Sequence, residues 1–235
     1  VDINVFATPG IDWYNNSSLS YQAIDMIEND RADSIYIMSA PRYSGETAMS
    51  ISDALGSVAI DSNYSATYWP WIQVRDTDNA TQLYIPPTGE VVKNIALTDN
   101  VSYPWFAVAG YSRGLVNAIK AYKKLTLDER DDLYKARINP IATFSDTGTI
   151  IWGNKTLQVR ESALDRINVR RLLLRARKLI SAVAAANSKT VVVIQSGGPV
   201  LMPWLDKVGA VIEAWFPGSS GGEAIARVLS GEVNP

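Results

Sequence analysis

The segment of this chain that most resembles catalytic machinery is Gly110–Gly114, which reads Gly-Tyr-Ser-Arg-Gly. It fits the G-x-S-x-G turn that exposes a nucleophilic serine in many hydrolases. Such a serine needs a histidine as its general base. The chain contains neither histidine nor cysteine, so the nucleophile interpretation of Ser112 fails, and disulfides and cysteine-ligated metal sites are excluded as well.

Other sites for metals or cofactors are equally poorly supported. Asp76, Asp78 and Asn79 suggest calcium ligands, but the segment lacks the glycine and the distal glutamate of an EF-hand loop, so we expect a solvated loop. Two early strands end in Thr-Pro-Gly and Ser-Ala-Pro, and neither ending is a phosphate-binding glycine pattern. The sequence therefore predicts no catalytic residue, no cofactor and no metal ligand.

A basic helix is the most distinctive feature that remains. At about 100° per residue, the apolar residues of Asp165–Val183 share one arc, which we expect to face the core. Its members are Val169, Leu172, Leu173, Ala176, Leu179, Ile180 and Val183. Two basic clusters lie beside the arc, with Ile167 and Leu174 between them. Apolar residues within a basic face are typical of a partner-binding helix, although a solvated basic face is the alternative.

We therefore predict that this helix forms a subunit or tube interface. The predicted interface residues are Arg166, Arg170, Arg171, Leu174, Arg175, Arg177 and Lys178.

The elements that must position this helix predict an α/β fold. Strand-like runs at residues 1–8, 34–39 and 66–74 alternate with helical patterns at residues 19–29 and 47–57. That alternation is typical of a parallel or mixed sheet with crossover helices. Pro9-Gly10 is expected to end the first strand, and Pro70 interrupts the third.

The following segments add smaller elements. Residues 115–125 are compatible with a helix or a strand and turn, and residues 127–134 predict a short acidic helix. A β-hairpin is expected around Asp146-Thr147-Gly148. Residues 190–195, Thr-Val-Val-Val-Ile-Gln, are typical of a buried parallel strand, and a second strand (208–216) and a helix (223–229) follow.

Composition limits the partners of the chain. It has 235 residues, 47% of them hydrophobic and 20% charged, with a net charge of −2. No bulk charge attracts it to nucleic acid or to anionic lipid, and no apolar run approaches the roughly 18 residues that span a membrane. We expect no nucleic-acid partner and no membrane insertion. Val1 opens directly on a strand-like run, so no signal peptide is expected.

Three ordered motifs give the larger part of the chain a family resemblance. The first is Ile85-Pro-Pro-Thr-Gly89 with Thr98-Asp99 and the run Trp105–Gly110. The second runs from Ile138-Asn-Pro-Ile141 to Trp152-Gly-Asn-Lys-Thr-Leu157. The third is Ile167-Asn-Val-Arg-Arg-Leu172. Together, over about residues 1–183, they resemble the sheath proteins of contractile phage tails.

This resemblance implies a structural, non-enzymatic subunit of the virion. Such subunits, assembled in the host cytoplasm, stack in rings around a tail tube above a baseplate. They contract to drive the tube through the host envelope. The partners implied are other sheath subunits, the tube protein and the baseplate. The resemblance also places a helix comparable to Asp165–Val183 near the tube.

Residues 184–235 resemble a different family. Ser196–Trp204, Glu213–Gly218 and Gly221–Ala226 are similar to the second, α/β-sandwich domain of family-3 glycoside hydrolases of the β-glucosidase type. The nucleophilic aspartate of that family belongs to a barrel domain of about 250 residues, which is absent here. The local carboxylates match no catalytic motif; they are Asp206, Glu213, Glu223 and Glu232.

We therefore predict two regions, 1–183 and 184–235, that join within the alanine-rich stretch near Ala182–Asn187. An artificial chimera, a recombined gene or a wrongly assigned sequence would each account for the two regions in one chain. The predicted function is that of the sheath subunit, and the alternative is a fragment or fusion of a β-glucosidase.

Overall fold

The computed structural model describes residues 3–41, 46–103, 105–198 and 200–234. The chain divides into two compact units, Val1–Leu174 and Arg175–Pro235. The boundary falls inside one long helix, α5 (Ile167–Ala186). This structural division does not test where the two sequence regions join, which stays a prediction. None of the described helices is long and apolar enough to cross a membrane.

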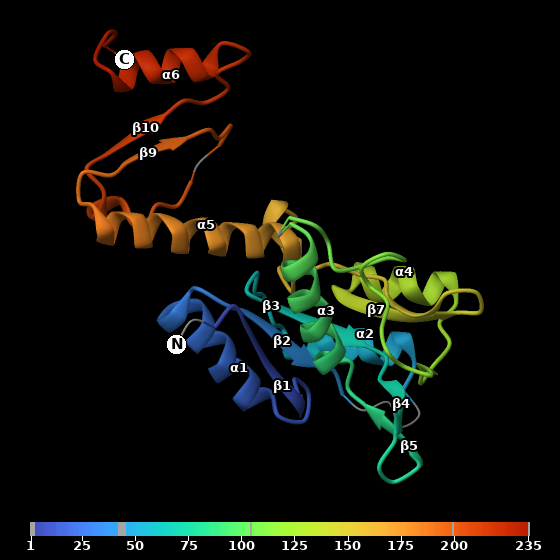
Figure 1. Ribbon diagram of the computed structural model, residues 1–235. Coiled ribbons are helices and arrows are strands. Elements are labelled where there is room, and N and C mark those ends of the chain that lie inside the picture. Colours follow the sequence, from blue (N-terminus) through green and yellow to red (C-terminus); the bar gives the residue numbers. More distant parts are fainter. Residues whose placement is uncertain (1–2, 42–45, 104, 199, 235) are drawn as a thin grey trace. The chain divides into compact units, whose positions relative to one another are not determined.

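Unit 1 is built on a five-stranded mixed sheet, which confirms the predicted α/β class (Figure 1). The first four strands in the sheet run parallel, and the last is antiparallel to its neighbour. In spatial order the strands are β1 (Val5–Asp12), β2 (Ile35–Ser39), β3 (Ser65–Trp69), β7 (Ile138–Phe144) and β8 (Gly148–Ile151). The predicted hairpin at Asp146-Thr147-Gly148 is the β7–β8 connection.

Helices cover both faces of this sheet, so its inner strands β2 and β3 are buried along their whole length. The core has two clusters of buried residues, one on each face of the sheet. The first includes Trp13, Ile27 and Leu55, and the second includes Ile37, Ile95 and Ile167. The first face carries α1 (Ser17–Asp25), its π-helical continuation η1 (Met26–Arg31), α2 (Ala48–Val58) and α4 (Leu127–Lys135). The second face carries α3 (Thr88–Val101) and the start of α5.

Three local expectations need correction or refinement. Strand β1 does not end at Pro9-Gly10, but continues to Asp12 after a register shift, with Gly10 at φ 86°. Residues 115–125 form no helix; apart from the short strand β6 (Lys120–Ala121) and an isolated bridge at Leu115, they are bends and irregular backbone. Pro70 does separate two strands, because β3 stays in the main sheet and β4 (Ile72–Asp76) belongs to a second one.

That second sheet has the order β5-β4-β6 and carries a long hairpin. Strand β5 (Thr81–Ile85) pairs antiparallel with β4 through five consecutive positions. The predicted solvated loop at Asp76–Asn79 forms the hairpin turn, where Asp76 accepts hydrogen bonds from Asn79 and from the Asp78 amide. The Asn79 side chain lowers the pKa of the Asp76 carboxyl. The aspartate stabilises its own turn.

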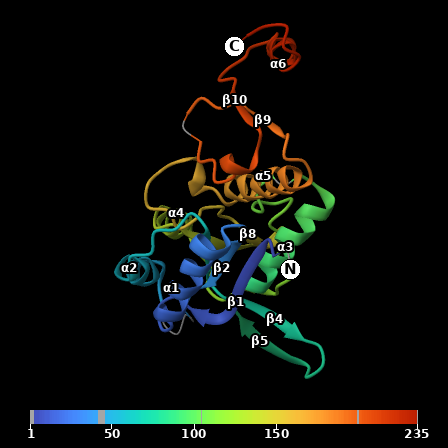
Figure 2. The same ribbon diagram turned by 90° about the vertical axis from the view of Figure 1, so that its left-hand side faces the viewer.

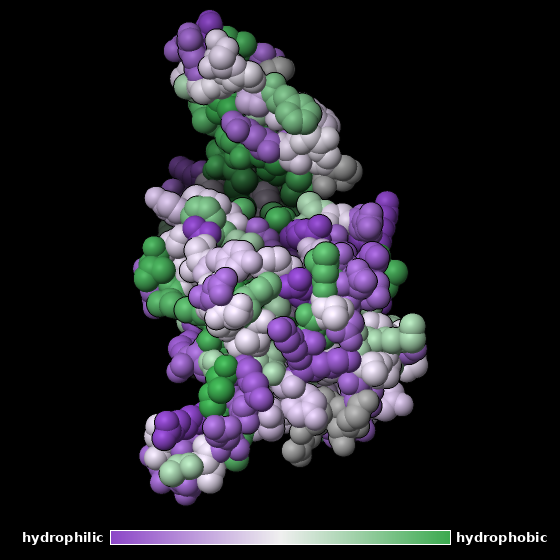
Figure 3. All heavy atoms as spheres, turned by 90° about the vertical axis from the view of Figure 1, so that its right-hand side faces the viewer, coloured by the Kyte–Doolittle hydropathy of each residue, from purple (hydrophilic) through white to green (hydrophobic). Residues whose placement is uncertain are grey.

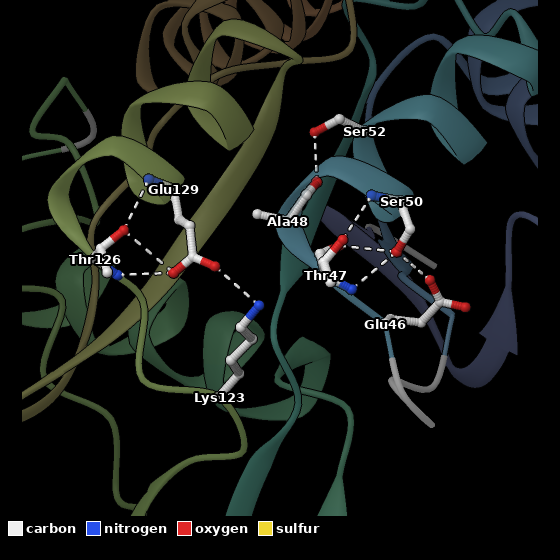
Figure 4. A network of polar contacts seen from close by, with 8 residues as sticks. All are labelled: Glu46, Thr47, Ala48, Ser50, Ser52, Lys123, Thr126 and Glu129. Carbon is white, nitrogen blue, oxygen red and sulfur yellow. Dashed lines mark hydrogen bonds and ion pairs between the residues drawn. The ribbon is translucent and has the colours of Figure 1, made fainter.

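Two capping boxes define where helices α2 and α4 begin (Figure 4). Thr47 and Ser50 bond reciprocally at the start of α2, and Thr126 and Glu129 do so at the start of α4. Lys123 lies 2.9 Å from the Glu129 carboxylate, and this contact lowers the pKa of that carboxyl. Each box satisfies backbone donors that a helix leaves open at its first turn.

Unit 2 contains the end of α5, two parallel strands and a short helix. The strands are β9 (Val191–Ile194) and β10 (Ala210–Glu213), and the helix is α6 (Gly221–Leu229). The parallel pairing is as predicted, but β9 is not buried: Val191 is 43% exposed. Trp204 and Ala184 are the described apolar side chains that unit 2 buries. Parallel strands normally need cover on both faces, so this pair has little core of its own.

Asn139 ties together the second motif of the sequence. Its side-chain amide donates to the carbonyl oxygens of Thr67 and Lys155, at 3.1 and 2.8 Å, and its Oδ1 accepts from the Lys155 amide at 2.6 Å. A Cβ on Gly153 would lie 2.6 Å from that Oδ1. The Asn-Pro-Ile and Trp-Gly sequences are therefore explained by one buried amide and the glycine that makes room for it.

We predict that Asn139→Ala lowers the free energy of unfolding by about 2–4 kcal/mol, because a fully buried amide loses three hydrogen bonds and leaves the Thr67 carbonyl oxygen buried without this donor. Denaturant unfolding followed by circular dichroism measures this. Asn29→Ala on the exposed surface is the matched control and should change it by less than about 0.5 kcal/mol. Equal effects of the two substitutions would contradict the assignment.

Candidate assembly interface

The beginning of α5 is fixed to unit 1 by a set of polar contacts. The Ile167 amide donates to the Asn154 carbonyl oxygen at 3.1 Å. The Asn168 side chain accepts from the Asn154 amide group at 2.5 Å and donates to the Trp105 carbonyl oxygen at 2.8 Å. Ile167 itself is buried in the second core cluster. The first turn of the helix therefore has a defined position on unit 1.

The next turn is held by a buried ion pair. Arg171 is 4% exposed, and its Nη2 lies 2.6 Å from Oδ1 of Asp99 on α3. Removing two charges from water is costly unless they are paired, so the short contact is what allows Arg171 to be buried. Its charge acts on Tyr68 as well: burial raises the pKa of that hydroxyl, and Arg171 opposes the rise.

These contacts overturn the predicted orientation of α5. The arc that was expected to face the core is largely outward: Leu173, Leu179 and Val183 are 46%, 65% and 45% exposed. The buried face contains Ile167, Arg171 and Leu174. The cause is Asp99, which supplies a counter-charge that a helical wheel of one segment cannot show.

The seven predicted interface residues thus fall into different environments. Arg171 and Leu174 are buried inside the chain and are not accessible to a partner. Arg170 stacks 3.5 Å above the ring of Tyr64, and Arg166 lies 3.1 Å from Asp165. Arg175, Arg177 and Lys178 are partly exposed on the following turns, in unit 2. The contact of these residues with a subunit or a tube remains a proposal.

Sequence reasoning missed four residues that position the helix: Asp99, Trp105, Asn154 and Tyr64. A signal was present for three of them, because Asp99, Trp105 and Asn154 lie inside the motifs that gave the resemblance. The structure brings those distant motifs together around Asn168 and Arg171. They describe one packing arrangement.

The segment Gly110–Gly114, whose sequence fits a nucleophile turn, also has a structural role. Gly110–Gly114 covers the edge of β8: the Gly110 amide donates to the Ile151 carbonyl oxygen at 2.8 Å, and the Ile151 amide donates to that of Gly114 at 2.7 Å. A Cβ on Gly114 would lie 2.6 Å from the Ile151 oxygen. Gly114 is therefore required by a close backbone approach, whereas Gly110 is favoured by its positive φ of 83°.

Within the described ranges, no group of three acidic, histidine or cysteine side chains could hold a metal ion. In unit 2, Glu213 Oε1 accepts from the amides of Trp215 and Ser196, at 3.1 and 3.4 Å. Glu232 lies 3.3 Å from Arg227. These two carboxylates therefore stabilise local structure.

Comparison with known proteins identifies two sources of similarity. The tail sheath protein of Vibrio phage KVP40 is 33% identical over 190 residues, which cover 72% of this chain and 28% of that protein. Beta-glucosidase B of Emericella nidulans is 62% identical over 58 residues, which cover 25% of this chain and 7% of that protein. The chain thus spans less than a third of either relative.

The fold of the chain is also similar to that of contractile sheath proteins. The helical sheath of the anti-feeding prophage in its contracted state matches 97% of this chain with a TM-score of 0.61 and 20% identity. Coverage of that extent exceeds unit 1 alone, so the shared fold includes most of unit 2.

A family model for the glycosyl hydrolase family 3 C-terminal domain matches residues 27–235. That range overlaps the sheath-like motifs, whereas the 62% identity with a β-glucosidase is confined to the 58-residue alignment. The chain belongs to the glycosyl hydrolase family 3 C-terminal domain family by the match over residues 27–235, and over most of its length it is also similar in sequence and fold to contractile sheath proteins.

Proposed function

We propose that this chain is a structural subunit of a contractile tail sheath, which assembles with copies of itself around a tail tube and contracts to drive the tube through a host envelope. The observation that carries the proposal is the similarity to the KVP40 tail sheath protein over 72% of the chain. The shared fold with a contracted sheath supports it. Its place is the virion tail, with assembly in the host cytoplasm and contact with the baseplate.

Helix α5 is the proposed contact surface. On its buried face Arg171 and Leu174 point inward, whereas Arg175, Arg177 and Lys178 are partly exposed. We assign the contact with an acidic tube or neighbouring subunit to Arg175, Arg177 and Lys178, with Arg166 and Arg170 beside them. Basic side chains on a helix that also exposes Leu173 and Leu179 suit a partner surface with both acidic and apolar groups.

We predict that the purified chain forms rings or tubes in negative-stain electron microscopy. Arg175→Glu combined with Lys178→Glu should reduce these assemblies at least tenfold, because the basic surface changes sign. Lys135→Glu on the exposed end of α4 is the control for reversal of a basic side chain outside the proposed surface and should assemble normally.

Thermal unfolding of both variants, recorded beside the assembly assay, separates lost assembly from lost folding. Undiminished assembly of the Arg175→Glu, Lys178→Glu variant would contradict the α5 surface. A parent chain that stays monomeric by light scattering would contradict the sheath proposal itself.

The second candidate is a fragment or fusion of a β-glucosidase, favoured by the 62% identity over 58 residues. A retaining glycosidase needs two carboxyl groups about 5–5.5 Å apart, one as nucleophile and one as acid. Asp206 and Glu213 are both exposed, and Glu213 already bonds two backbone amides. We therefore propose that the chain has no glycosidase activity of its own.

We predict that the chain does not hydrolyse a chromogenic aryl-β-glucoside above the rate of a buffer blank. Asp206→Asn and Glu213→Gln should leave that background unchanged. Turnover that either substitution abolishes would refute the non-enzymatic assignment and favour the second candidate.

A further inference from the structure

Strand β6 joins a projecting arm of unit 1 to the main sheet. The arm is the β4–β5 hairpin, which projects from the body of unit 1 in both ribbon views (Figure 1 and Figure 2) and is polar at its tip (Figure 3). Strand β6 pairs with the other side of β4. The Ala121 amide of β6 donates to Oγ1 of Thr143 on β7 at 2.7 Å, and that oxygen lies 3.0 Å from Oγ1 of Thr149 on β8. The base of the arm is therefore fixed to the carboxyl end of β7.

A cavity of about 280 Å³ lies at this junction. Its lining residues come from β6, from the segment after it and from the end of β7: Lys120, Ala121, Tyr122, Lys124, Thr143 and Ser145. Ligands of α/β folds commonly bind at the carboxyl ends of the parallel strands, and β7 is parallel to its neighbour β3. Ligand pockets begin at a volume of about 300 Å³. The cavity is therefore suited to a small molecule or to a single side chain.

The charged side chains that line the cavity are both basic. Lys120 and Lys124 are exposed, and neither forms an ion pair with another residue in the described part of the chain. Lys123, by contrast, is paired with Glu129 at 2.9 Å. Asp146 belongs to the neighbouring hairpin turn but does not line the cavity. Because a cleft lined by charges of one sign raises the local concentration of counter-ions, this cavity is suited to an anion.

The rest of the wall is largely apolar. Ala121 is buried, and the ring of Tyr122 packs edge-on against the ring of Tyr84, with the centroids 5.0 Å apart. The stems of the two lysines add further hydrocarbon surface. An inorganic anion would leave this surface in water, whereas an anionic group on a hydrocarbon stem would cover it. The wall therefore favours an organic anion over an inorganic one.

We propose that the cavity between β6 and the end of β7 binds a carboxylate carried on a short aliphatic stem. The carboxylate lies between the ammonium groups of Lys120 and Lys124, where the Ser145 hydroxyl can donate a hydrogen bond. The stem packs on Ala121 and Tyr122. A free dicarboxylate and the glutamate side chain of an acidic peptide share this chemistry.

The proposal does not depend on the assembly surface. All of the lining residues belong to unit 1, and none of them lies on α5. Binding can therefore be present in a chain that does not assemble, and assembly can proceed in a chain whose cavity has been changed. The two proposals are refuted by different measurements.

Saturation-transfer difference NMR on the full chain with glutarate tests the cavity, because it detects ligand methylene protons that contact a protein of any assembly state. We expect a saturable glutarate signal at constant ionic strength and none from glutaramide, the uncharged analogue. Lys120→Met combined with Lys124→Met should weaken glutarate binding at least about fivefold, since two exposed ammonium groups are lost. Lys189→Met combined with Lys207→Met makes the same charge change on exposed lysines of unit 2 and should leave binding unchanged.

Competition against glutarate distinguishes the two sources of the carboxylate. A short oligoglutamate peptide that displaces glutarate at a lower concentration than butyrate does would support the cavity as a site for an acidic peptide. A peptide that displaces glutarate less well than butyrate would support it as a site for a free carboxylate. Equal glutarate binding by the parent and the Lys120→Met, Lys124→Met variant would overturn the proposal. So would a glutaramide signal as strong as that of glutarate, or displacement by inorganic phosphate at a lower concentration than by butyrate.

Discussion

The buried pair between Arg171 and Asp99 decides how the longest helix lies on unit 1. A guanidinium that is 4% exposed is tolerable only because a carboxylate lies 2.6 Å away on α3. With this pair in place, Ile167, Arg171 and Leu174 face inward. Leu173 and Leu179 are then exposed, and Arg175, Arg177 and Lys178 are partly exposed. The surface that we assign to assembly therefore depends on one contact inside the chain.

The sequence predicted local elements better than contacts between them. The crossover pattern, the hairpin at Asp146-Thr147-Gly148 and the acidic helix could be recognised because short-range periodicity and turn residues specify them. The core-facing side of α5 was predicted wrongly. A wheel counts apolar residues, whereas the buried side depends on Asp99, which lies 72 positions earlier in the chain. Strand β1 likewise continues past Pro9 because an edge strand can tolerate a missing amide.

The residues of the candidate site could be found in the sequence, but the contacts between them could not. The motifs that gave the resemblance contain Asp99, Trp105, Asn139 and Asn168, although nothing in the sequence alone showed that they meet. The contacts of these four residues show that they have packing roles. Ser112 lies in a backbone turn between Gly110 and Gly114, and both glycines bond the backbone of Ile151. The sequence of unit 2 is similar to an enzyme domain, but unit 2 buries few apolar side chains among its described residues.

A double-mutant cycle on Asp99→Asn and Arg171→Met tests the central constraint most directly. Denaturant unfolding should show that each single substitution costs about 3–5 kcal/mol, because it leaves one buried charge without its partner. The double variant should cost at least about 2 kcal/mol less than the sum of the two, since neither charge then remains to be buried alone. Costs that simply add would mean that the pair does not hold α5, and would contradict the account.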